Sequence, residues 1–205
     1  METRFSSRYI EASAGGTSSG LFKGTSSMKP IGDKNLILIG MPSAGKSTLG
    51  QCLARALSFS FLDTDQLMEE RWGCLLQEII DSEGLEAFRR REAKTVLSLD
   101  VVGHVISTGG SVVYSPRAMA HLQDLGRILW LDLPLEELER RLANGMESRG
   151  IVRTPEQSLA DLYYERRPLY ERYAQMRVET QGKTNQQVVK EILKFIHLSR
   201  SPRQE

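Results

Sequence analysis

The chain has 205 residues, of which 40% are hydrophobic and 26% charged, and its formal net charge is +1. This length fits one domain with its own hydrophobic core, and a second full domain is not expected. A charge so close to zero, with acidic and basic residues interspersed, excludes the positive field that would attract nucleic acid or an anionic membrane. No apolar stretch is long enough to cross a bilayer or to form a signal-peptide core. We therefore expect a cytoplasmic protein.

The two cysteines predict neither a redox pair nor a metal site. Cys52 and Cys74 are far apart and lie in segments predicted to be helical. Two buried thiols in a reducing compartment are the expected outcome.

Residues 1–33 differ in composition from the rest of the chain, since Ser, Thr and Gly dominate and large apolar side chains are few. Such a segment cannot bury enough apolar surface to fold, so we predict a flexible N-terminal tail. An organelle transit peptide remains an alternative, although Glu2 and Glu11 are unusual in one. A true start at Met28 rather than Met1 is a second alternative.

The apolar run 35–39 predicts a strand, and it leads directly into the loop 40–48 and a predicted helix over 49–57. In a loop of this pattern the glycines let the backbone curl, so that successive N–H groups point at phosphate oxygens at a helix N-terminus. Lysine then supplies a charge for the β- and γ-phosphates, and a hydroxyl binds Mg²⁺. The predicted nucleotide-binding residues of this loop are Gly40, Ser43, Ala44, Gly45, Lys46, Ser47 and Thr48.

Strands and helices then alternate to the end of the chain. Further strands are predicted at 59–62, 104–107, 127–133 and 176–179, and helices at 66–72, 75–81, 85–99, 116–123, 134–143, from 155 onward, and at 185–196. This alternation predicts a parallel sheet of five strands between two layers of helices, with the nucleotide at the carboxyl ends of the strands. The kinase domain is predicted to cover 34–197, with a mobile lid at about 144–156 and a C-terminal tail at 198–205.

Five segments in order, 40–48, 62–65, 88–92, 107–110 and 166–170, make the chain resemble the shikimate kinase family across 35–196. The resemblance implies a P-loop kinase with a three-layer α/β/α fold. Its activity would be ATP- and Mg²⁺-dependent phosphorylation of shikimate to shikimate 3-phosphate, in the biosynthesis of chorismate and the aromatic amino acids. The partners would be ATP and this small anionic hydroxy acid, and we expect a monomer.

The resemblance also assigns roles near the second strand. Ser47 and Asp63 would bind the metal, and Asp65 would bind substrate hydroxyls and accept the proton. Two carboxylates one residue apart on a strand point opposite ways, so this division requires the strand to end in a bend. A helix N-cap pair before Gln66 is the structural alternative, and the two roles are compatible.

The acid group of the substrate would be held by Arg89 and Arg166, because a planar guanidinium pairs with a carboxylate through two hydrogen bonds. Glu92 would orient Arg89 and touch substrate, while Gly109 and Gly110 would offer backbone donors. Arg90 and Arg91 are interpreted as a solvated basic patch, and Arg167 is an ambiguous neighbour of Arg166.

Two features depart from the family pattern. Ser111 stands where the family has a third consecutive glycine, and its hydroxymethyl group would narrow the pocket or add a hydrogen bond. The lid lacks the usual Arg-Pro-Leu-Leu run. Arg149 is the expected catalytic and nucleotide-binding lid arginine, with Arg153 as its rival, and Arg141 is expected to stack on adenine. Because lids contact substrate, these departures keep two alternatives open: a related kinase for another hydroxy acid or polyol, and a nucleotide-binding regulator.

Overall fold

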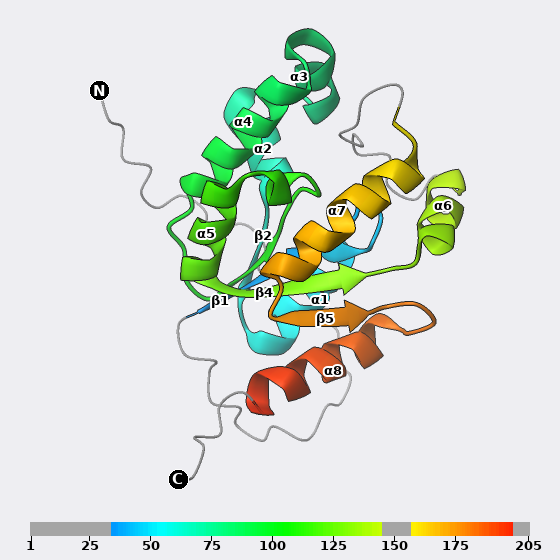
Figure 1. The fold of residues 1–205 in the computed structure, drawn as a ribbon. Helices are drawn as coiled ribbons and strands as arrows, with labels where there is room; N and C mark the ends of the chain where they lie inside the picture. Colours follow the sequence, from blue (N-terminus) through cyan, green and yellow to red (C-terminus); the bar gives the residue numbers. More distant parts are fainter. Residues whose placement is uncertain (1–33, 145–156, 199–205) are drawn as a thin grey trace, which may run out of the picture.

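The computed structural model describes residues 34–144 and 157–198, and these build one parallel sheet covered by helices (Figure 1). The strand order is β2-β3-β1-β4-β5, with every neighbouring pair parallel. The bounds are β1 Asn35–Ile39, β2 Ser60–Asp63, β3 His104–Ser107, β4 Gly126–Asp132 and β5 Met176–Glu179. The predicted five-stranded parallel sheet is confirmed.

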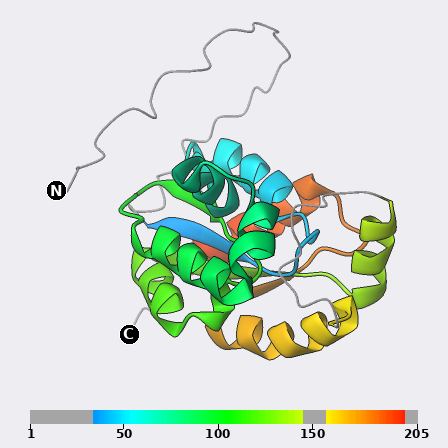
Figure 2. The ribbon, with the colours of Figure 1, turned by 90° about the horizontal axis from the view of Figure 1, so that it is seen from above.

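Helices lie on both faces of the sheet, which gives three layers. They are α1 Lys46–Leu57, α2 Thr64–Trp72, α3 Leu76–Glu83, α4 Leu85–Leu97, the 3₁₀ helix η1 Val112–Tyr114, α5 Pro116–Leu125, α6 Leu135–Ala143, α7 Leu159–Tyr173 and α8 Asn185–Leu198. Figure 2 shows α1 on one side of the strands and α5 and α7 on the other. The helix α8 packs beside α1, while α2, α3 and α4 form the upper part of Figure 1.

The first strand of the sequence is the centre of the sheet. All five residues of β1 are buried, and the strand pairs with β3 on one side and β4 on the other. Covered on both faces, it is apolar at its last four positions, 36–39, rather than alternating. Ile37 and Leu38 are fully buried in the main core, so β1 gives the loop that follows it a rigid base.

Several boundaries differ from the predicted ones at the points where loops meet helices. The helix α1 begins at Lys46 rather than at residue 49, because Gly45 adopts φ 90° and turns the chain directly into the helix. The helix α2 begins at Thr64, capped by Asp63. Pro134 is the N-cap residue of α6 rather than part of its first turn, and the turn η1 was not predicted.

The expectation for the cysteines was partly wrong. Cys52 on α1 and Cys74 are half-buried rather than buried. Cys74 lies in the bend between α2 and α3, where Gly73 with φ 68° ends the first of these helices. No helix within 34–144 and 157–198 is long and apolar enough to cross a membrane. The predicted tail 1–33 and nearly all of the predicted lid lie outside the described residues, whereas α8 extends to Leu198.

Candidate active site

The carboxyl ends of β1, β2 and β3 open into one cleft, which α4 and α7 close from the side. Fourteen residues line it: Pro42, Ser43, Gly45, Lys46, Ser47, Asp65, Leu76, Phe88, Glu92, Ser107, Thr108, Gly109, Gly110 and Arg166. Residues that are more than a hundred positions apart in sequence therefore meet at the edge of the sheet where ligands of open α/β folds bind.

The loop after β1 is held in a tight curl against the sheet. Gly40 has φ 145°, and a Cβ added there would lie 2.6 Å from the carbonyl oxygen of Leu131. Ser43 also adopts a left-handed conformation, with φ 62°. Only glycine fits where the loop approaches β4 so closely. The curl points the backbone into the N-terminus of α1, the arrangement that binds phosphate.

Lys46 reaches back across this loop. Its Nζ donates hydrogen bonds to the carbonyl oxygens of Gly40 (3.0 Å) and Met41 (2.8 Å), and the residue is buried. The backbone of the loop therefore holds the ammonium group at the cleft. Without Lys46, these two carbonyl oxygens would lose this hydrogen-bond donor. Ala44 is buried and Thr48 is exposed on the first turn of α1.

Ser47 and Asp63 meet at the start of α1 and the end of β2. The Ser47 hydroxyl donates to Asp63 Oδ2 at 2.7 Å, while Asp63 Oδ1 accepts the backbone N–H of Asp65 at 3.0 Å. Asp63 is thus a helix cap as well as a partner of the loop hydroxyl. The predicted cap is confirmed, and metal binding by Ser47 and Asp63 stays a prediction. A hydroxyl beside a carboxylate is a donor set of oxygens that fits Mg²⁺, whose remaining ligands are commonly phosphate oxygens and water.

The strand-to-helix bend required for Asp65 is present. β2 ends at Asp63 and α2 begins at Thr64, so Asp63 is buried while Asp65 turns into the cleft. A Cβ on Gly109 would overlap Glu92 Oε1 and lie 2.7 Å from Asp65 Oδ1. Two carboxylates from different helices therefore converge over one glycine. The Gly109 N–H itself donates to Thr64 Oγ1 at 3.1 Å, so here it is part of the frame rather than an open donor.

Glu92 is the most deeply buried acid of the cleft, with an exposed fraction of 3%. The pKa of Glu92 is raised to about 7, chiefly because the carboxyl group is buried; the Ser111 hydrogen bond opposes this rise, the Asp65 carboxylate contributes to it, and Arg166 and Arg89 oppose it. Ser111 Oγ donates to Glu92 Oε2 at 2.6 Å. Glu92 Oε1 is buried without a hydrogen-bond partner in the described part of the chain, and it lies on the side of Gly109 and the cleft. Of the two effects predicted for Ser111, the structure shows the hydrogen bond.

Arg166 is the arginine of α7 that faces the cleft. It is fully buried, and its Nε donates to the Tyr114 hydroxyl at 3.3 Å. Arg167 points to another side of the helix, where Nη1 donates to the Tyr163 hydroxyl at 2.8 Å. This resolves the ambiguity between the two neighbours. A Cβ on Gly110 would lie 2.9 Å from Arg166 Nη1, so a side chain at this position would displace the end of the Arg166 side chain.

Arg89 lies at the edge of the cleft and is not among its lining residues. Its Nη1 pairs with Glu86 at 3.0 Å, and its guanidinium carbon lies 4.2 Å from the centre of the Tyr114 ring. The expectation that Glu92 orients Arg89 differs from this arrangement, because Glu86 holds the guanidinium and Ser111 holds Glu92.

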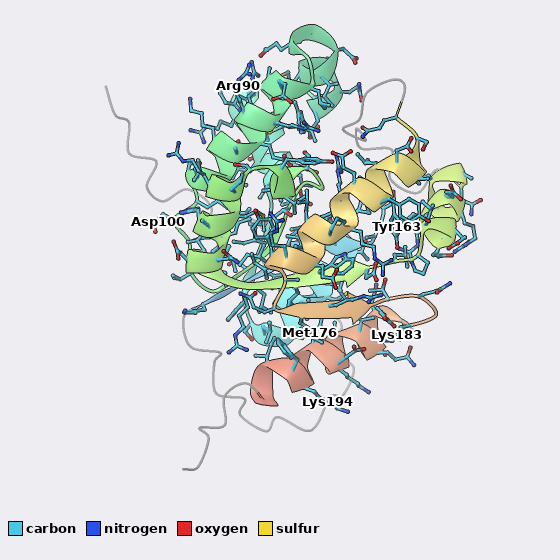
Figure 3. All side chains as sticks on the ribbon, in the orientation of Figure 1. Arg90, Asp100, Tyr163, Met176, Lys183 and Lys194 are labelled. Atoms are coloured by element: carbon cyan, nitrogen blue, oxygen red, sulfur yellow. The ribbon has the colours of Figure 1, made fainter. Side chains whose placement is uncertain are left out.

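The neighbouring arginines of α4 point outward. Arg90 is exposed on the outer side of the helix (Figure 3). Arg91 pairs with Glu83 and lies 4.3 Å from the centre of the Trp72 ring. Neither lines the cleft. The predicted solvated patch is confirmed for Arg90 and is wrong for Arg91, because Glu83 and Trp72 hold its half-buried side chain.

Arg141, at the end of α6, lies against the phosphate loop. Its Nη1 donates to the carbonyl oxygen of Ser43 at 3.1 Å, and Glu137 Oε1 accepts from its Nε at 3.1 Å. Its stacking on adenine stays a prediction. Arg149 and Arg153 lie outside the described residues.

Sequence reasoning missed two contributors. Tyr114 touches both acid-binding candidates, Arg89 and Arg166, and no motif marks it. Phe88 packs in a buried hydrophobic cluster and lines the cleft as well. For Phe88 the signal was available, because the residue directly precedes Arg89.

Comparison with known proteins places the chain among small-molecule kinases. A family model described as shikimate kinase matches residues 42–197. A shikimate kinase of a Sulfurihydrogenibium species is 35% identical over 161 residues, covering 78% of this chain and 96% of that protein. One of Francisella tularensis subsp. novicida is 34% identical over 170 residues, covering 81% and 96%. The structure of the Acinetobacter baumannii shikimate kinase in complex with shikimate aligns with a TM-score of 0.73 and 30% identity, covering 83% of this chain and 97% of that one.

Proposed function

The chain belongs to the shikimate kinase family, and we propose that it transfers the γ-phosphoryl group of ATP to the 3-hydroxyl of shikimate. The observation that carries the proposal is the convergence of Asp65, Glu92 and Arg166 beside the phosphate loop. Phosphoryl transfer needs little covalent chemistry from the protein, so catalysis consists of positioning and charge stabilisation.

Asp65 is the residue that we propose acts on the acceptor hydroxyl. It lies at the cleft, next to Glu92 and Gly109, and within the turn that follows Asp63. In the proposed reaction its carboxylate accepts a hydrogen bond from the attacking hydroxyl and takes the proton as the new O–P bond forms. Lys46 stabilises the charge on the transferring phosphoryl group, and Arg149 is proposed to assist from the lid.

The metal proposed for this site is Mg²⁺, held by Ser47 and Asp63 together with the phosphates. When bound, it would supply positive charge that offsets the negative charge of the phosphates. The Ser47–Asp63 hydrogen bond of 2.7 Å supports this assignment, because it brings the two oxygen ligands side by side. We further propose a monomeric, cytoplasmic enzyme.

The test is a coupled assay of ADP release with MgATP and shikimate, beside a panel of other hydroxy acids and polyols. Shikimate-dependent turnover far above the ATPase background supports the proposal. Turnover with another acceptor instead would favour the related-kinase alternative, for which Ser111 in place of a glycine is the specific observation. ATP binding without turnover of any acceptor would favour a regulator.

Arg89→Lys is expected to weaken the binding of the acid substrate while leaving the binding of ATP unchanged. Lysine loses both the planar fork and the stacking on Tyr114, so the KM for shikimate should rise by the equivalent of about 1–3 kcal/mol, roughly 5- to 150-fold. The matched control is Arg90→Lys, an exposed position on the same helix. Steady-state kinetics with each substrate varied in turn measure the effect, and an unchanged KM for shikimate in Arg89→Lys would remove this residue from the acid site.

A further inference from the structure

Tyr114 contacts both arginines proposed to hold the acid group. The guanidinium carbon of Arg89 lies 4.2 Å from the ring centre, and that of Arg166 lies 5.3 Å from it. The Tyr114 hydroxyl also accepts a hydrogen bond from Arg166 Nε at 3.3 Å. One aromatic side chain therefore contacts a cation from α4 and a cation from α7.

The position of Tyr114 is fixed by the turn that carries it. It is the last residue of η1, which follows Gly109, Gly110 and Ser111 without a break. Its backbone N–H donates to the carbonyl oxygen of Ser111 at 3.0 Å, and Ser111 in turn donates to Glu92. The turn thus ties Tyr114 to the floor of the cleft while its ring extends toward the two arginines.

The ring and the hydroxyl of Tyr114 act on the arginines in different ways. A guanidinium stacked on an aromatic face keeps its in-plane N–H groups available, because the attraction acts through the face of the cation. The Tyr114 hydroxyl accepts from Nε of Arg166 and so orients the guanidinium through the edge that carries Nε. A carboxylate pairs with a different edge, the one formed by the two terminal nitrogens. Burial raises the pKa of Tyr114, so the phenol stays neutral and does not compete with the substrate as an anion.

We propose that Tyr114 is a positioning residue that holds Arg89 and Arg166 at one spacing and thereby makes the acceptor site selective for acids over uncharged analogues. This inference rests on the proposed function, since it names how that site recognises its substrate. Without the ring, Arg89 would keep its ion pair with Glu86, whose exposed carboxylate draws the guanidinium away from the cleft.

The experiment compares Tyr114→Phe, which removes the hydroxyl, and Tyr114→Leu, which removes the ring as well. The control is Tyr164→Leu, an aromatic on α7 with an exposed fraction of 66%. For each enzyme kcat and KM are measured for shikimate, for its uncharged carboxamide and for ATP. Circular dichroism and thermal unfolding show whether each variant folds, and Tyr114→Phe, which keeps the ring and its packing, remains interpretable if Tyr114→Leu does not.

The expected result is graded. The KM for shikimate should rise by roughly 5-fold in Tyr114→Phe and roughly 50-fold in Tyr114→Leu, with the KM for ATP unchanged. The preference for shikimate over the carboxamide should fall by the same factors, because only the charged acceptor uses the arginine pair. If Tyr114 had a merely structural role, kcat/KM would fall by the same factor for shikimate and for the carboxamide.

Three outcomes are distinguishable. If the wild type phosphorylates shikimate and both Tyr114 variants keep its preference for the acid, the inference is overturned and the proposed function stands. If the wild type does not phosphorylate shikimate, the proposed function fails and the inference falls with it. If the preference falls in Tyr114→Leu alone, the ring positions the arginines and the role of the hydroxyl is refuted.

Discussion

Replacement of Asp65 by Asn should lower kcat by about 10²–10⁴-fold with little change in the KM for ATP. Asparagine has the same shape and keeps the Asp65 backbone N–H that bonds to Asp63, so the cap of α2 is preserved. What is lost is the carboxylate that orients the attacking hydroxyl and accepts its proton. Stopped-flow or coupled measurement of ADP release at saturating shikimate and MgATP checks the change.

The control for this substitution is Asp100→Asn, at an exposed position away from the cleft (Figure 3). Nucleotide affinity, measured by fluorescence titration, should be the same in both variants and in the wild type. Near-normal turnover in Asp65→Asn would exclude a proton-accepting role for this carboxylate and shift attention to Glu92, the other acid over Gly109.

Glu92→Gln should reduce the loss of stability that the wild type undergoes as the pH rises. The free energy of unfolding should fall less between pH 5 and pH 8 in the variant than in the wild type. The pKa of Glu92 rises from 4.5 to about 7 because the carboxyl is buried. A group with a raised pKa in the folded state adds stability that is complete below pH 4.5 and is lost as the pH rises through about 7. Across pH 5 to 8 the wild type should therefore lose about 2–3 kcal/mol that Glu92→Gln does not lose.

Urea unfolding of both proteins at several pH values measures this difference directly. The comparison is made between pH values within each protein, so a constant cost of the substitution cancels. Glutamine still accepts the hydrogen bond of Ser111, which keeps the packing comparable. The exposed Glu136→Gln serves as control. Parallel stability curves for wild type and Glu92→Gln would mean that Glu92 titrates as an ordinary exposed acid.

The sequence predicted the parts of the site that depend on local chain geometry. The loop from Gly40 to Thr48 carries its conformation in its own residues, since glycines permit the left-handed turns and Lys46 bonds to the loop it follows. The end of β2 was predictable for a similar reason, because Asp63 caps the helix that begins at the next residue.

The parts that could not be predicted depend on side chains that meet across long sequence separations. Tyr114 contacts Arg89 and Arg166, which belong to two different helices, and no spacing rule connects the three. The family resemblance predicts that Glu92 orients Arg89, but spacing alone does not favour it, since Glu86 also lies one helical turn from Arg89. Burial decides between the two: Glu92 faces inward to Ser111, and Glu86 stays at the surface.

The central position of β1 has a consequence for how the chain is made. This strand is synthesised before all others described, yet its partners β3 and β4 end only at Ser107 and Asp132. A ribosome must therefore produce nearly a hundred further residues while the most apolar strand of the core has no completed sheet to join. Sheets whose strands pair across such long sequence separations fold slowly, and their unpaired apolar strands are prone to aggregation until the sheet is complete. The same placement that gives the phosphate loop its rigid base thus leaves an apolar strand without its partners for most of the synthesis of the sheet.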